Sequence, residues 1–164
     1  MADDKTAAGL IEMWDTHCAV NHLLLGLVPD EALPAIPLLK TGKPGRGRDI
    51  AKVFMHIYAA RHSHLEAMAK KYVKDLPKPE RGATGTRREI TAVLQATDKA
   101  VADLVSERIK TGKPVRKRHP AVFIGYLISH ESHHRGQVML ALKQNGFTLS
   151  DELKWGIWSR WFKD

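Results

Sequence analysis

The chain has 164 residues, of which 43% are hydrophobic and 27% are charged. This composition is typical of a globular protein, and the length fits one domain over residues 1–164 with a substantial core. No apolar run approaches the roughly 20 residues that a transmembrane helix needs, and the polar N-terminus does not resemble a signal peptide. The lone Cys18 excludes an internal disulfide. We therefore expect a cytoplasmic protein without a membrane partner.

The net charge of +8 is compatible with nucleic acid or with small anions as partners. The basic residues gather in segment 110–119 and in two shorter pairs, which are predicted loops and helix ends. These segments lack interleaved aromatic residues for stacking on bases. Cations at a helix C-terminus are also favoured by the helix dipole alone. We therefore do not expect a nucleic-acid partner.

Helical periodicity recurs in four long segments that turn residues separate. The first runs from about residue 4 to 27, and His17 and Asn21 lie on its apolar stripe. The second follows a loop rich in proline and glycine and runs from about 48 to 74. Neither loop length nor periodicity fixes the direction of the second helix, because the loop between the first and second helices is long enough to span the bundle.

The third helix is expected from Thr86, which begins a capping-box pattern, to about residue 110. The fourth is expected over 120–144, because proline suits its first turn and Asn-Gly follows its end. A short helix after Ser150 carries a dense aromatic tail, which we expect to cap the bundle or to lie in a dimer interface. No segment alternates with period two, so the sequence predicts an all-α four-helix bundle with a short C-terminal helix.

Histidine is frequent, with nine residues, and it clusters in the fourth helix. His130 and His134 are spaced i, i+4 and project from one helix face, about 5–6 Å apart. They share a stripe with Leu127, Val138 and Ala141. His133 lies on the neighbouring stripe. Imidazole suits zinc, nickel, copper and iron, so His130 and His134 are candidate ligands of a metal ion. Solvated surface histidines are the alternative.

A third ligand must come from another element, and the second helix carries His56, His62 and His64. His56 and His64 share a face, whereas His62 lies elsewhere. The pattern leaves His56 and His64 equally open, and it does not settle whether His64 or His133 joins the site.

Arg48 leads into the helix with His56, and the block His130-x-x-x-His134-Arg-Gly-Gln137 follows in the fourth helix. This arrangement resembles the DinB/YfiT-like family of metalloenzymes over nearly the whole chain. The resemblance implies a four-helix bundle with long crossover connections, assembled as a homodimer. It also implies one divalent metal ion, with zinc or nickel expected, on His56, His130 and His134.

Three protein ligands with open positions are typical of a catalytic ion. The resemblance implies low-molecular-weight thiol S-transferases and thiol-dependent isomerases, and such an ion also activates water for hydrolysis. We therefore expect a metal-dependent enzyme that acts on a small-molecule substrate and uses a low-molecular-weight thiol. The alternative is a non-catalytic, stress-related protein that binds a metal or a small ligand.

Residues 130–134 also spell HExxH, the metallopeptidase motif in which glutamate is the general base. The extended motif fails, because Gln137 stands where glycine should and Leu140 where the third histidine should. No strand is predicted to bind a peptide backbone. A peptidase is therefore a lesser alternative, and Glu131 is kept as a catalytic candidate.

Three further residues are candidates for the site. Arg135 directly follows a ligand and is expected, as a catalytic residue, to attract a carboxylate-bearing thiol. His17 and Asn21 are expected to line the metal cavity as cofactor-binding residues. An ordinary interior hydrogen-bonded pair is the alternative for these two.

Overall fold

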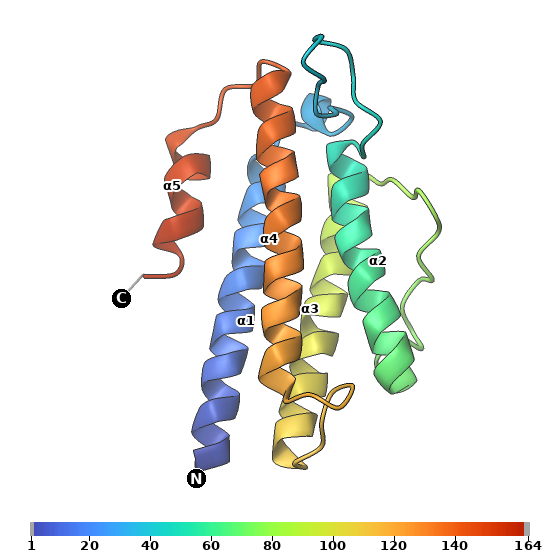
Figure 1. The fold of residues 1–164 in the computed structure, drawn as a ribbon, viewed down its shortest axis with the longest axis vertical. Coiled ribbons are helices and arrows are strands. Elements are labelled where there is room, and N and C mark those ends of the chain that lie inside the picture. Colours follow the sequence, from blue (N-terminus) through green and yellow to red (C-terminus); the bar gives the residue numbers. More distant parts are fainter. Residues whose placement is uncertain (1, 163–164) are drawn as a thin grey trace.

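The computed structural model describes residues 2–162, with side chains from residue 5 onward, so Met1, Lys163 and Asp164 of the predicted domain lie outside it. Its elements are α1 (Ala2–Leu27), η1 (Asp30–Ala32), α2 (Ile50–Ala69), η2 (Lys70–Tyr72), α3 (Arg87–Lys110), α4 (Pro120–Gln144) and α5 (Asp151–Ser159). Residues 2–162 contain no strand, and their only β-type pairings are two isolated bridges. The prediction of an all-α bundle is confirmed (Figure 1).

Helix ends follow the capping chemistry of the sequence. Thr86 and Glu89 form the predicted capping box at the start of α3, and Asp49 caps α2 by accepting from the Lys52 amide at 2.8 Å. One boundary was predicted wrongly. The second helix ends at Ala69 and not near residue 74, because the backbone of Ala69 (φ −163°, ψ 75°) leaves the helical region and a 3-10 turn follows.

The four long helices run up, down, down and up in Figure 1. The connection of residues 28–49 stays at one end of the bundle. Residues 70–86 instead run back along the outside from the end of α2 to the start of α3, which is the expected crossover. Each of α1 and α2 packs against both α3 and α4. Therefore α2 and α4 are antiparallel neighbours.

Two hydrophobic clusters fill the bundle, one toward each end. The upper cluster includes, from α1 to α4 in turn, Leu24, Phe54, Leu94 and Val138, and the lower includes Trp14, Leu65, Val101 and Leu127. Between these positions each helix contributes buried polar residues, namely His17 and Asn21, Arg61, Thr97, and Glu131. A buried polar layer therefore crosses the bundle at mid-height.

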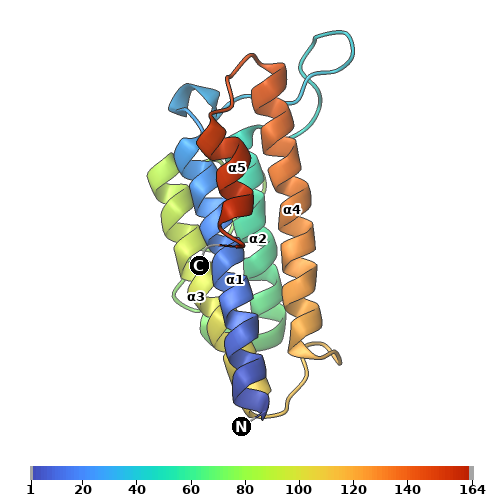
Figure 2. The ribbon, with the colours of Figure 1, turned by 90° about the vertical axis from the view of Figure 1, so that its left-hand side faces the viewer.

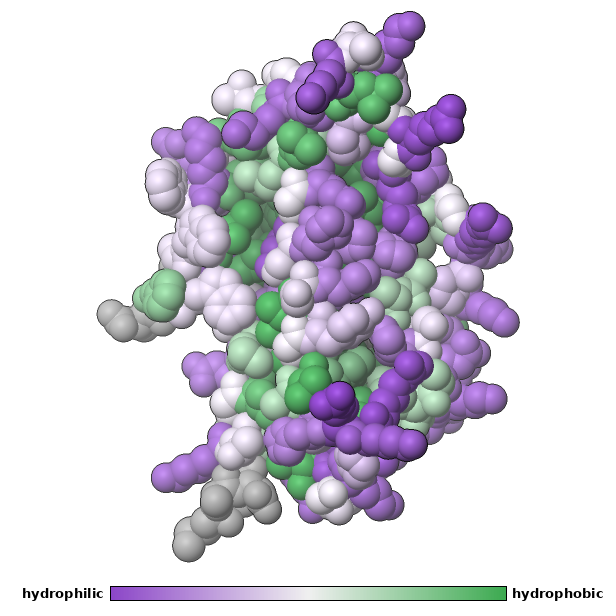
Figure 3. All heavy atoms as spheres, viewed as in Figure 1, coloured by the Kyte–Doolittle hydropathy of each residue, from purple (hydrophilic) through white to green (hydrophobic). Residues whose placement is uncertain are grey.

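The short α5 packs across α1 on the side away from α2 (Figure 2). Leu153 anchors it and is only 2% exposed, whereas Trp155, Trp158 and Phe162 remain exposed. In Figure 3 weakly polar to hydrophobic side chains stand out from the edge of the molecule at which α5 lies in Figure 1. The tail thus covers part of the bundle, and its place in a dimer interface stays a prediction. None of the helices in residues 2–162 is long and apolar enough to cross a membrane.

Candidate metal centre

Three histidines converge between α2 and α4. His56 comes from the second turn of α2, and His130 and His134 come from successive turns of α4. One ring nitrogen of each lies within 4.8 Å of those of the other two. His134 is buried and the other two are half-buried. The structure therefore brings together the three residues that were predicted as metal ligands.

The spacing of the nitrogens fits a metal ion. Nε2 of His130 lies 3.2 Å from Nε2 of His134. With zinc–nitrogen bonds of about 2.0–2.1 Å at tetrahedral angles, two ligand nitrogens are about 3.3 Å apart. The ring of His56 stands nearly perpendicular to that of His134, with centroids 4.7 Å apart. One ion can thus contact all three rings after a small adjustment of His56.

Gln137 sets which nitrogen of His134 is free. Its Oε1 accepts a hydrogen bond from Nδ1 of His134 at 2.9 Å, so the lone pair of that ring resides on Nε2. Its amide nitrogen lies 3.1 Å from Nε2 of the exposed His133. Gln137 is not among the predicted site residues. Gln137 lies at i+3 from His134 and i+4 from His133, and this spacing could have indicated that it contacts their rings.

The three rings are neutral at pH 7, as ligands must be. Burial lowers the pKa of each ring below its ordinary 6.5, and the charge of Arg48 lowers all three further. For His56 the pKa falls to about 4. Nδ1 of His130 is buried and has no hydrogen-bond partner within the described part of the chain. The donor set is thus three neutral imidazoles.

The other histidines of the two helices lie outside this cluster. His64 is half-buried, and its ring meets that of Tyr126 at 5.1 Å. His62 is buried against Tyr58. Because α2 rises about 1.5 Å per residue, His64 lies about 12 Å from His56 along the helix axis. Of the three histidines of α2, only His56 belongs to the cluster with His130 and His134.

Glu131 belongs to the buried polar layer and is fully buried. Arg61 of α2 donates to both of its carboxylate oxygens, each at 2.7 Å. His17 and Asn21 of α1 donate to Oε2 at 2.8 and 2.7 Å. Burial alone would raise the pKa of Glu131, but the charge of Arg61 and these hydrogen bonds lower it to about 2. Glu131 therefore joins three helices as an anion.

Arg135 continues this layer. Its guanidinium donates to Oδ1 of Asn21 at 2.8 Å, to Nδ1 of His17 at 3.2 Å and to Oγ of Ser132 at 2.6 Å. Because Nδ1 of His17 accepts a hydrogen bond, the ring proton is on Nε2, which donates a hydrogen bond to Glu131. The layer is thus a connected network of donors and acceptors.

These contacts bear on four candidate site residues. His17 and Asn21 bond to Glu131 and Arg135, so the contacts support the alternative of an interior hydrogen-bonded pair. A carboxylate with a pKa near 2 and three donors is a poor general base at neutral pH. Catalytic roles for Glu131 and Arg135 and a cofactor contact for His17 and Asn21 stay predictions.

Arg61 is fully buried but is not among the predicted site residues. It reaches Glu131 on α4 and Asp98 on α3, and its guanidinium lies 4.8 Å from the centroid of the Trp14 ring. A lone arginine inside a helix gives no sign of its partners, because all of them are distant in the sequence.

A small cationic pocket of about 180 Å³ opens beside His56. Its lining includes Arg48, which precedes α2, Lys52 of α2, and Glu80 and Arg81 of the crossover. The positive charges outnumber the negative one, so this pocket favours an anionic group next to the histidine cluster.

A model of the DinB family matches residues 4–151, which include all three histidines. No curated protein and no solved structure matches the chain.

Proposed function

Because the chain belongs to the DinB family, we propose that it is a metal-dependent enzyme that transfers a low-molecular-weight thiol to a small electrophilic substrate. The observation that carries the proposal is the convergence of His56, His130 and His134 within 4.8 Å. All three are neutral, and no carboxylate or cysteine joins the cluster among the described residues. A divalent ion on such ligands keeps its full positive charge.

An ion at this site, with zinc or nickel expected, would supply a positive charge that stabilises a bound thiolate. The reaction forms a bond between the thiol sulfur and a carbon of the electrophile. The bond from that carbon to a halide breaks, and the halide leaves with the electron pair. The proton of the thiol goes to solvent.

The cationic pocket supports a thiol that bears carboxylates. The pocket beside His56 carries the positive charges of Arg48, Lys52 and Arg81. If the carboxylate of a thiol compound binds there, the sulfur of the same compound is held near the histidine cluster. Lys52 is also paired with Asp49 at 2.7 Å, which leaves Arg48 and Arg81 as the stronger attractions. The half-exposed position of this pocket predicts that added salt weakens thiol binding.

The test is a steady-state assay with glutathione, bacillithiol, mycothiol and cysteine against a halonitroarene. We expect the rate to fall to background in metal-free protein and to return when zinc or nickel is added. Equal rates for metal-free and metal-loaded protein with every thiol would reject the transferase. The non-catalytic metal-binding protein would then be the better account.

Two further parts of the proposal concern the setting of the enzyme. We expect a homodimer, because Trp155 and Trp158 of α5 and Phe162, which follows it, are exposed and a second copy would cover them. We expect a cytoplasmic location, because a free thiol substrate needs a reducing compartment. Sedimentation equilibrium and cell fractionation test these two expectations.

A further inference from the structure

A second pocket lies further along α2 and α4, toward His64 and Tyr126, and shares no lining residue with the cationic pocket. It has a volume of about 250 Å³ and sits between the lower part of α2, the start of α4 and the loop that joins α3 to α4. Its lining residues are His64, Val115, Arg116, Arg118, Val122, Phe123 and Tyr126. We refer to it as the aromatic groove.

The surface of the aromatic groove is almost entirely apolar, although two arginines border it. Val122 and Tyr126 are large hydrophobic residues that are 54% and 47% exposed. The rings of Phe123 and Tyr126 meet the ring of His64 edge to face, at 5.9 and 5.1 Å. Aromatic walls with this geometry favour a planar apolar ligand.

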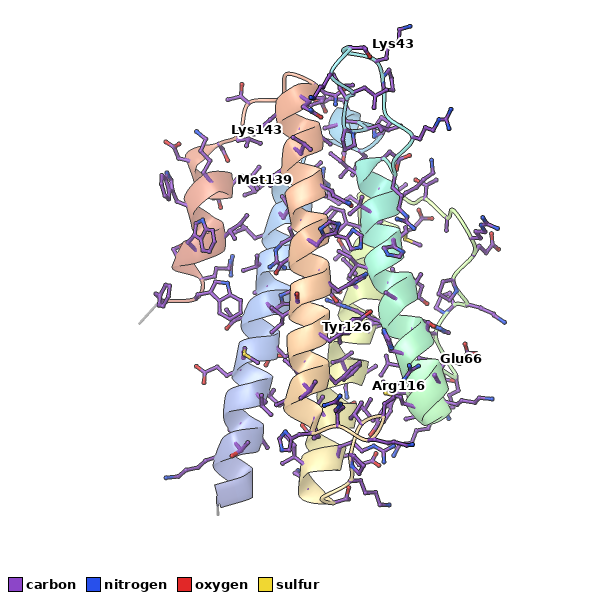
Figure 4. The ribbon with its side chains drawn as sticks, in the orientation of Figure 1. Lys43, Glu66, Arg116, Tyr126, Met139 and Lys143 are labelled. Carbon is purple, nitrogen blue, oxygen red and sulfur yellow. The ribbon has the colours of Figure 1, made fainter. Side chains whose placement is uncertain are left out.

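Tyr126 joins the aromatic groove to the histidine cluster. Its ring is stacked on that of His130, with the planes 15° apart and the centroids 5.9 Å apart. Figure 4 shows Tyr126 and Arg116 together in the space between α4 and α2. A ligand on Tyr126 therefore lies one ring away from a candidate metal ligand.

The outer wall of the groove is held in a fixed shape. Val115 and Arg118 close a two-residue turn with two hydrogen bonds of 2.9 Å, and Val115 is buried. Arg116 and Lys117 within the turn have φ of 45° and 65°, a region that non-glycine residues rarely adopt. Such a conformation persists only where the surrounding contacts impose it.

From this arrangement we infer that the aromatic groove binds the electrophile, and that the electrophile is a compact, uncharged aromatic compound. The inference rests on the proposed function. Two pockets of different chemistry then adjoin the histidine cluster: His56 lines the cationic one, for the thiol, and Tyr126 of the apolar one, for the acceptor, stacks on His130. The volume of the aromatic groove is smaller than the roughly 300–1,000 Å³ of sites for drug-sized ligands. This limits the electrophile to about one substituted ring.

The first test measures binding without turnover. The probe is 1,3-dinitrobenzene, which has the shape of a halonitroarene but no leaving group, and it is titrated into metal-free protein by calorimetry or NMR. Tyr126→Ala removes the aromatic wall and Val122→Glu puts a charge at the mouth without touching His130. We expect each to weaken binding about five- to tenfold. Leu140→Ala is the matched control, because Leu140 is equally exposed on α4 and lies outside the groove.

The second test uses the metal-loaded enzyme. We expect Val122→Glu to raise KM for the halonitroarene by a similar factor and to leave KM for the thiol and the metal content unchanged. The inference would be overturned if Tyr126→Ala and Val122→Glu changed dinitrobenzene binding and the KM for the halonitroarene no more than Leu140→Ala does. The failure of the proposed function is distinct from this outcome, because it is seen as equal rates of metal-free and metal-loaded wild-type protein.

Discussion

Glu131→Gln tests the physical role of the buried polar layer. The substitution keeps the shape of the side chain but removes the charge that faces Arg61, which is fully buried. The new amide N–H₂ group would also face the donors of Arg61, His17 or Asn21, which now reach the carboxylate. We therefore expect Glu131→Gln to fold but to lose much of its stability.

Two independent arguments give the expected loss of unfolding free energy in Glu131→Gln. Lowering the pKa of Glu131 from its ordinary 4.5 to about 2 corresponds to roughly 3 kcal/mol at 1.36 kcal/mol per pKa unit. Removal of one partner from a buried ion pair costs about 3–5 kcal/mol in other proteins. Because Arg61 keeps Asp98 as a partner, we expect a loss of about 3 kcal/mol in the free energy of unfolding.

The assay is urea denaturation of metal-free protein, so that metal binding to the folded state does not contribute to the midpoint. Glu66→Gln is the control, because Glu66 is exposed near the end of α2 (Figure 4), and it should change stability by less than about 0.5 kcal/mol. We expect Glu131→Gln to retain the metal, and the protein to cleave no peptide. An unfolding free energy within about 0.5 kcal/mol of wild type would refute the structural role of Glu131. Peptide cleavage that Glu131→Gln abolishes would instead promote the metallopeptidase.

The same carboxylate makes stability depend on pH in metal-free protein. Its folded pKa is below its unfolded value, so its contribution is full above about pH 4.5 and is lost as the pH falls toward 2, which acid titration of the unfolding midpoint will show. Metal affinity should change little from pH 8 to 7 and should fall in more acidic solution, because burial lowers the pKa of His56, His130 and His134 below the ordinary 6.5. A decline that begins above pH 7 would contradict this burial. Gly125→Ala should stabilise α4 by about 0.5–1 kcal/mol, because a Cβ there meets no atom within 4 Å. Gly45→Ala should destabilise the protein, because its Cβ would lie 2.8 Å from a backbone oxygen. Thermal midpoints that move in the same direction for Gly125→Ala and Gly45→Ala would contradict the described packing.

Local chemistry in the sequence predicts the helices well. The capping box at Thr86, the proline at position 120 and the glycine at position 146 mark helix ends that the structure confirms. The order of the helices in space could not be predicted, because long connections such as residues 28–49 impose no direction. The crossover came from family resemblance alone, since contacts between helices are set by packing distant in sequence.

The site divides in the same way. The phase of α4 correctly places His134 inside and His133 outside. Phase could not separate His56 from His64, because both share a face of α2, and only the antiparallel packing of α2 on α4 selects the height of His56. The sequence offers an interior hydrogen-bonded pair for His17 and Asn21, but it does not predict the partner of Glu131. Arg61 comes from another helix, and no spacing rule links the two residues.

Elemental analysis of the purified protein tests the metal centre most directly. We predict about one first-row divalent ion per chain in the wild type and its loss in His56→Ala, His130→Ala and His134→Ala. His62→Ala and His133→Ala are the controls and should keep the ion, because neither residue belongs to the cluster. Circular dichroism should show that all variants remain helical. Full metal occupancy in folded His56→Ala would contradict a site built on these three histidines.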